Sequence, residues 1–174
     1  MKKTIIRYGL YGGTVICVLF LLSLYLADGL DFGAQEVIGY ASMVVALSFV
    51  YFGIRHFRDR ENSGTLNFGA GLKIGLGISL ITALMFGILD VIYVKYMNPD
   101  FMETYYASVL ADLEASLPES EFQERARAME AEKELFTNPL MNFFLMFITV
   151  FLIGLIMSII SAQILKRKPS TATS

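Results

Sequence analysis

Hydrophobic residues gather into four long stretches of the chain, separated by polar connections. The stretches cover residues 8–27, 37–54, 74–94 and 140–165, and Asp90 is the one charged residue inside them. A helix needs about 20 apolar residues to cross about 30 Å of hydrocarbon, and lipid offers no partner to unpaired backbone groups. The pattern therefore predicts an all-α membrane protein, with four transmembrane helices in a single membrane domain over residues 1–174.

The first stretch follows Lys2 and Lys3, as the apolar core of a secretory signal would. A signal core has about 7–15 apolar residues, and this stretch is longer. We therefore expect residues 8–27 to be the first span of the protein.

Basic residues predict the orientation of the four spans. One set of span ends carries ten of the 14 lysines and arginines: Lys2, Lys3, Arg7, Arg55, Arg58, Arg60, Lys73, Lys166, Arg167 and Lys168. The opposite side has Asp28, Asp31 and Glu36 in its first connection and only Lys95 near a span end. Because basic residues mark the cytoplasmic side, both termini are predicted to be cytoplasmic.

Residues 97–138 connect the third and fourth stretches and have a helical period of their own. Apolar residues recur at helical spacing on both sides of Pro118, at Phe101, Tyr105, Val109, Leu113, Phe122, Ala126 and Met129. Asn98-Pro99 favours a helix start, and Ser120 with Gln123 resembles a capping box. Ten acidic residues stand against three basic ones here. The segment is predicted to be a helical hairpin outside the membrane, on the periplasmic side.

Composition narrows the chemistry that the chain can carry. Hydrophobic residues make up 55% of the chain and charged residues 17%. In a soluble domain about 45–50% of the residues are apolar and about 25% are charged. One cysteine, Cys17, excludes an internal disulfide, and one histidine, His56, leaves little for a metal site or a serine-type triad. We expect no catalytic residue, no metal, no cofactor and no nucleic-acid partner.

Small residues recur on one side of several spans. They are Gly71, Gly75, Ser79, Ala83 and Gly87 around the third span, Gly39, Ser42, Ala46 and Gly53 in the second, and Gly154 and Ser158 in the fourth. Small residues let helix backbones approach closely within a membrane. These positions are predicted to be helix-packing faces, used within the chain or between copies in a homo-oligomer.

Asp90 is a candidate functional residue because an ionisable group inside a span is costly. Helical geometry places it near the side of Ser79 and Ala83, and so toward the bundle. The simpler interpretation is a carboxylate that reaches interfacial water or pairs with Lys95 or Tyr93. The alternative is a polar site for a transported species.

Arg55, His56 and Arg58 form a basic cluster after the second span. Basic residues are enriched at the cytoplasmic ends of spans, where they are also attracted to anionic lipid head groups, and both effects explain such a cluster. The alternative is a docking site for an acidic ligand or partner.

Six segments carry a family resemblance: 39–43 (GYASM), 46–59 (ALSFVYFGIRHFRD), 64–69 (GTLNFG), 93–101 (YVKYMNPDF), 138–140 (NPL) and 158–168 (SIISAQILKRK). Through them the chain resembles a bacterial membrane family, domain of unknown function 4199, over nearly its whole length. The resemblance implies a four-span protein of a Gram-negative inner membrane. It brings no activity or catalytic residues with it.

Three functions are consistent with these observations. The one we favour is a non-enzymatic interaction, assembly or regulatory component of the bacterial inner membrane, with a homo-oligomer or another membrane protein as its partner. The alternative is a small transporter or channel subunit with Asp90 as its intramembrane polar site. A lipid-modifying enzyme would depend on His56, and only the basic cluster supports it.

Overall fold

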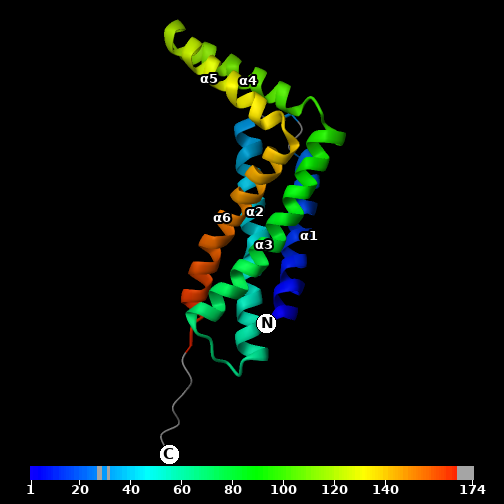
Figure 1. Cartoon of the computed structure of the whole chain (residues 1–174), viewed down its shortest axis with the longest axis vertical. Coiled ribbons are helices and arrows are strands. Elements are labelled where there is room, and N and C mark those ends of the chain that lie inside the picture. Colours follow the sequence, from blue (N-terminus) through cyan, green and yellow to red (C-terminus); the bar gives the residue numbers. More distant parts are fainter. Residues whose placement is uncertain (27–28, 31, 168–174) are drawn as a thin grey trace, which may run out of the picture. The chain divides into compact units, whose positions relative to one another are not determined.

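The structure is a computed structural model that describes residues 1–26, 29–30 and 32–167, without the side chains of residues 26, 32, 131–132 and 134–137. This part of the chain is helical throughout its regular elements (Figure 1). The elements are α1 (Lys2–Leu26), α2 (Phe32–His56), the π-helical turn η1 (Phe57–Glu61), α3 (Phe68–Ile92), the π-helical turn η2 (Tyr93–Met97), α4 (Phe101–Ser116), α5 (Glu119–Thr137) and α6 (Pro139–Leu165).

Four helical segments are long and apolar enough to cross a membrane: Lys2–Tyr25, Gly33–Glu61, Phe68–Met97 and Pro139–Leu165. Each contains most of one predicted stretch, and α4 and α5 lie between the third and the fourth. The predicted all-α membrane fold is therefore confirmed. Among the residues used for the sequence predictions, Ala27, Asp28, Asp31 and Lys168 lie outside the described residues.

The described chain packs as two compact units. The first contains Met1–Phe86 and the part of the chain from Phe147 onward, and the second is Gly87–Met146. The prediction of a single domain with an inserted hairpin stays a prediction, because the second unit holds the ends of α3 and α6 together with α4 and α5.

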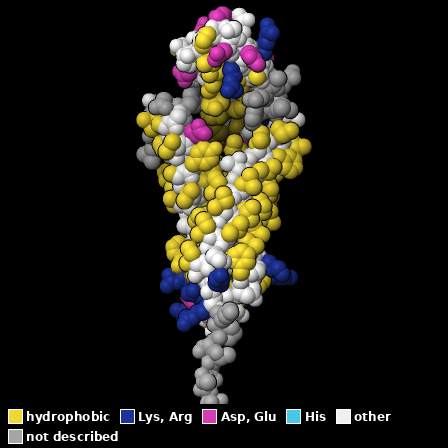
Figure 2. All heavy atoms as spheres, turned by 90° about the vertical axis from the view of Figure 1, so that its left-hand side faces the viewer, with side chains coloured by type: hydrophobic (Ala, Val, Ile, Leu, Met, Phe, Trp, Pro, Cys, Tyr) yellow, Lys and Arg dark blue, Asp and Glu magenta, His cyan; other side chains and the backbone are white. Residues whose placement is uncertain are grey.

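The first unit has large apolar side chains outside and small ones inside. On α6, Ile148, Leu152 and Ile156 are exposed, whereas Gly154 and Ser158 are buried. Figure 2 shows hydrophobic side chains over the visible face of this bundle. A water-soluble protein would not expose so much contiguous apolar surface, and a hydrocarbon environment accounts for it.

A short clamp ties the connection before α3 to the end of α6 within the first unit. Leu66 and Arg167 form an antiparallel β-bridge, with N–H···O distances of 2.9 and 2.8 Å in the two directions. Arg58 also donates to the carbonyl oxygen of Leu165 over 3.4 Å. These bonds satisfy backbone groups that the ends of a helix leave unpaired.

The helices of the hairpin begin at different residues from those predicted. Pro99 was expected to lie in the first turn of α4, but that helix begins at Phe101, after Asp100. The carbonyl of Pro118 accepts the amide of Phe122 at 2.9 Å, so α5 begins at Glu119. The predicted capping box is therefore wrong, because Ser120 lies within the first turn, and Gln123 donates to the carboxylate of Glu119 over 2.8 Å.

Candidate functional site

Asp90 of α3 and Asn142 of α6 form a buried polar pair in the second unit. The side-chain amide of Asn142 donates to the Asp90 carboxylate over 2.6 Å, and the two residues are 7% and 4% exposed. A buried carboxylate is costly unless hydrogen bonds replace its hydration. The Asn142 amide supplies one such bond in a part of the chain that is otherwise largely apolar.

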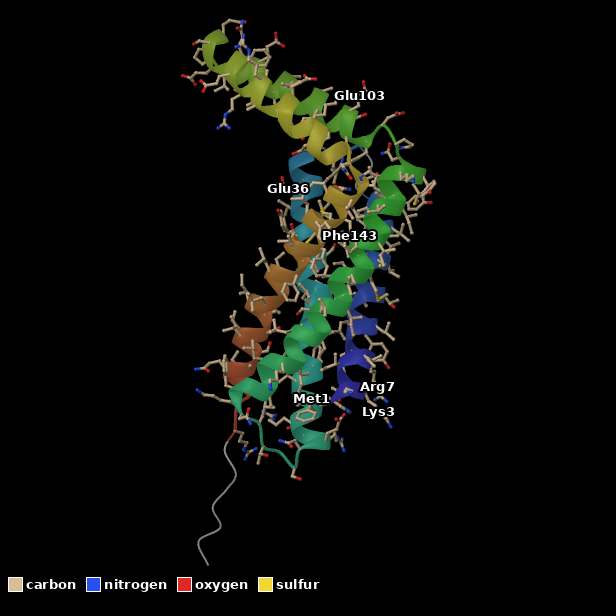
Figure 3. The ribbon with its side chains drawn as sticks, in the orientation of Figure 1. Met1, Lys3, Arg7, Glu36, Glu103 and Phe143 are labelled. Atoms are coloured by element: carbon tan, nitrogen blue, oxygen red, sulfur yellow. The ribbon has the colours of Figure 1, made fainter. Side chains whose placement is uncertain are left out.

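Local sequence explains how Asn142 reaches Asp90. Pro139 begins α6, where its missing N–H costs nothing, and the side-chain oxygen of Asn138 accepts the amide of Leu140 at 3.0 Å. Gly87 lies one turn before Asp90, and a Cβ there would come within 2.9 Å of the Phe143 ring (labelled in Figure 3). The absence of a side chain at Gly87 lets the two helices approach at the polar pair.

Lys95 does not form the ion pair with Asp90 that the sequence suggested. Its ammonium lies 5.3 Å from the centre of the Tyr96 ring, in a cation–π arrangement. The Tyr93 hydroxyl accepts a hydrogen bond of 3.1 Å from the side chain of Asn98. The prediction that Asp90 faces the protein interior agrees with its burial, but the partner from α6 replaces the proposed pairing with Lys95.

A cavity of about 300 Å³ adjoins the polar pair in the second unit, and Asn142 is part of its wall. Its charged lining residues in the described part of the chain are Lys95, Glu103 and Lys133. Its apolar lining includes Val91, Val94 and Met102. A second hollow of about 170 Å³ between α4 and α5 shares Glu103 and Lys133 with it.

The predicted small-residue face of α3 meets α6 in the first unit. A Cβ at Gly71 would lie 3.0 Å from the Ala162 Cβ, and one at Gly75 would lie 3.1 Å from the Ser158 Cα. Ser79 packs against Gly154 in the same way, and its Oγ is 3.4 Å from that of Ser158. This face is therefore used within the chain.

The other predicted packing residues divide into two groups. Gly53 packs against Tyr8 and Ile78, and Ala46 and Ala83 are fully buried. A Cβ at Gly39 would meet nothing within 4 Å, and the Ser42 hydroxyl bonds to the Ile38 carbonyl of its own helix at 2.8 Å. Any contact between copies through the predicted faces would therefore use the end of α2 that contains Gly39.

The basic cluster, with Arg55 and His56 at the end of α2 and Arg58 in η1, is engaged largely within the chain. Arg58 forms a two-pronged ion pair with Asp59, at 2.6 and 3.1 Å, in addition to its bond to Leu165. His56 lies 3.9 Å from the Glu61 carboxylate and packs against the Tyr8 ring. Arg55 is more than half exposed and lies 3.6 Å from Asp59. Arg55 is thus more accessible to an outside anion than Arg58.

Sequence reasoning missed two contributors. Asn142 is visible as a polar residue inside the fourth stretch, but no local pattern pairs it with Asp90. The glycines of α1 carry a signal that was not used: Gly9, Gly12 and Gly13 pack against Ile81, Thr82 and Met85 of α3.

Within the described residues, no three His, Cys, Asp or Glu side chains are grouped so that they could hold a metal ion. In the same part of the chain, every buried side-chain nitrogen and oxygen has a hydrogen-bond partner. The Asp90–Asn142 pair and the adjoining cavity are thus the most distinctive polar features of the second unit.

No curated protein and no solved structure matches the chain. The profile of one family, described as Protein of unknown function (DUF4199), matches residues 7–167. This match spans nearly all of the chain and includes every helix described above except the first turn of α1. The chain is therefore a four-span, all-α member of the DUF4199 family.

Proposed function

We propose that this protein is a non-enzymatic interaction or assembly component of the bacterial inner membrane, and that α4 and α5 form its contact surface. The observation that carries the proposal is the thin core formed by those side chains of this helix pair that the structure describes. Tyr106 is the one residue of α4 that is buried, and the apolar residues Leu113, Phe122 and Met129 are half-buried. Such a pair retains apolar surface for a partner.

The charge of the helix pair supports a partner with a basic surface. Exposed acidic residues lie along both helices, at Glu103, Asp112, Glu114, Glu119, Glu121, Glu124 and Glu130. Figure 2 shows acidic side chains on this pair. Complementary charge raises association rates and favours specific partners.

Site-specific crosslinking in native membranes tests the proposal. A photoreactive residue at Asp112 or Glu121 is expected to give a discrete product, identified by mass spectrometry. The same probe at Ile156, on the lipid-exposed face of α6, serves as the control. With the probe at Asp112, neutralising Glu119, Glu121 and Glu124 to glutamine should weaken the product. Hairpin probes that give no partner and no second copy of the chain would refute the proposed function.

The same proposal places both termini in the cytoplasm and the helix pair of α4 and α5 in the periplasm. Lys3 and Arg7 lie at one end of the first unit and Glu36 lies toward its other end (Figure 3). This separation agrees with the positive-inside rule. Exposed Lys2, Arg55, Lys73 and Lys166 would then meet anionic head groups, at about 1 kcal/mol each near the surface.

Cysteine labelling distinguishes the two orientations. In a Cys17→Ser background, Glu121→Cys should react with an impermeant maleimide in spheroplasts. Ser63→Cys, in the exposed connection after η1, should react only after the membrane is permeabilised. The reverse result would place the helix pair in the cytoplasm.

A small transporter or channel subunit is the second candidate, and the buried Asp90–Asn142 pair favours it. Polar groups at membrane depth commonly mark ion or substrate paths. Asp90→Asn keeps the shape and removes the ionisable group. Ion or solute flux into proteoliposomes that falls at least tenfold in Asp90→Asn would support this function. Equal flux in the two proteins, or none in either, would exclude a role for Asp90 in transport.

A further inference from the structure

The cavity beside Asn142 combines positive charge with apolar walls. Lys95 from η2 and Lys133 from α5 line it together, although they are far apart in sequence. Val91 and Val94 precede Lys95 on the same wall, and Met102 of α4 contributes another apolar side chain. A ligand that fits this lining has an anionic group joined to an apolar part.

A lysine on the cavity wall is unexpected in the acidic segment that contains α4 and α5. Residues 97–138 contain three basic residues against ten acidic ones, and Lys133 is the basic residue among these three that lines the cavity. Among the lining side chains that the structure describes, two lysines and one glutamate, Glu103, give a formal charge of +1. A singly charged phosphodiester matches this charge better than a free phosphate, which carries about −1.5 to −2 at neutral pH.

The size of the cavity limits what it can hold. Sites for whole small molecules run from about 300 to 1,000 Å³, so this cavity is at the lower limit. It can accept a head group and the beginning of an acyl chain, and the rest of a lipid would remain outside. Its walls include the last turns of the segment Phe68–Met97 and the first turn of Pro139–Leu165, which are the levels of a span where lipid head groups lie.

We propose that this cavity binds the phosphodiester head group of a membrane phospholipid, with Lys95 and Lys133 contacting the phosphate. Val91, Val94 and Met102 would contact the first part of an acyl chain. The Asn142 amide, already bonded to Asp90, forms the inner wall. Ammonium-to-phosphate contacts are charge-assisted hydrogen bonds, which are shorter and stronger than neutral ones.

Native mass spectrometry of the full chain, released from detergent after mixing with phosphatidylglycerol or phosphatidylethanolamine, tests this inference. We expect one phospholipid per chain to be retained. Lys95→Gln should weaken the apparent affinity by about tenfold, the size expected for one charge-assisted contact. Arg127→Gln is the matched control, because it makes the same charge change on an exposed residue of α5 outside the cavity, and it should bind as the unmodified chain does.

A second variant separates the apolar part of the site from its charge. Val94→Trp fills the cavity without changing the charge and should also reduce retention, while circular dichroism confirms that the helices remain. Glycerol 3-phosphate, at the same concentration, should not displace the lipid. Equal retention by the unmodified chain, Lys95→Gln and Val94→Trp would overturn the proposal. Displacement by glycerol 3-phosphate would overturn it too, in favour of a site for soluble phosphate esters.

Discussion

Helices α3 and α6 meet in both compact units, and the chemistry of the contact differs between them. In the first unit, Gly71, Gly75 and Ser79 bring the α3 backbone against small residues of α6. In the second unit, Gly87 meets the ring of Phe143, and Asp90 accepts a hydrogen bond from Asn142. The first contact is close because its residues have small side chains or none. The second is made by the ring of Phe143 and by the hydrogen bond between Asn142 and Asp90.

This difference separates structural residues from candidate functional ones. A contact made by glycine and serine gains dispersion energy and excludes lipid, and nothing in it titrates or selects a ligand. A contact made by a carboxylate and an amide is costly to bury unless it is satisfied, and it adjoins a cavity. Three predictions test how far the distinction holds, and a fourth concerns the bonds of Arg58.

The largest expected effect comes from Gly75→Leu. Even a Cβ at this position would lie 2.7 Å from the Ser158 Cβ and 3.1 Å from its Cα, so the helices must separate. We expect a loss of about 3 kcal/mol of stability, measured by thermal unfolding in detergent followed by circular dichroism. Gly39→Leu is the matched control, because a Cβ there meets nothing. Similar losses in both variants would mean that the small-residue face does not hold α3 against α6.

Asn142→Leu should cost about 1.5 kcal/mol, because it leaves the Asp90 carboxylate buried without that amide. The double variant Asp90→Leu with Asn142→Leu should recover most of the stability that Asn142→Leu loses. The same unfolding measurement on the two single variants and the double variant gives the coupling energy. Strictly additive losses would show that the two side chains do not stabilise each other.

Gly87→Ala should cost about 1 kcal/mol, less than a change at Gly75. The nearest atoms to the new Cβ belong to the Phe143 ring, at 2.9 and 3.0 Å, and a ring can turn aside more easily than a backbone can. Gly39→Ala controls for the intrinsic helix preference of alanine. A larger loss for Gly87→Ala than for Gly75→Ala would reverse the comparison between the two contacts.

The smallest effects are expected at Arg58 and Arg55. Arg58→Gln removes its ion pair with Asp59 and the bond to the α6 carbonyl, at a cost of about 0.5 kcal/mol for a pair near the surface. Arg55→Gln should be nearly neutral, because its pair with Asp59 is longer and more exposed. High salt should reduce the difference between the two variants.

The spans and the small-residue face of α3 could be predicted because both follow from residues close in sequence. Uncharged stretches of sufficient length specify spans, and a four-residue repeat from Gly71 to Gly87 specifies one side of a helix. The partner of Asp90 could not be predicted, because Asn142 comes 52 residues later and its alignment depends on where α6 begins. The start of α5 was missed because Pro118 supplies the first helical carbonyl, and the Ser120 pattern gives no indication of this.

The close approach of α3 and α6 in the first unit also bears on permeation. A Cβ built on Gly75 would already touch the Ser158 backbone, so a water molecule, let alone a hydrated ion, finds no room between these two helices at that level. If a solute does cross the bilayer with the help of this protein, it must pass along another surface of the bundle or between neighbouring copies. For a path between copies the conducting unit is an assembly, and its conductance would rise more steeply than in proportion to the number of chains in the membrane.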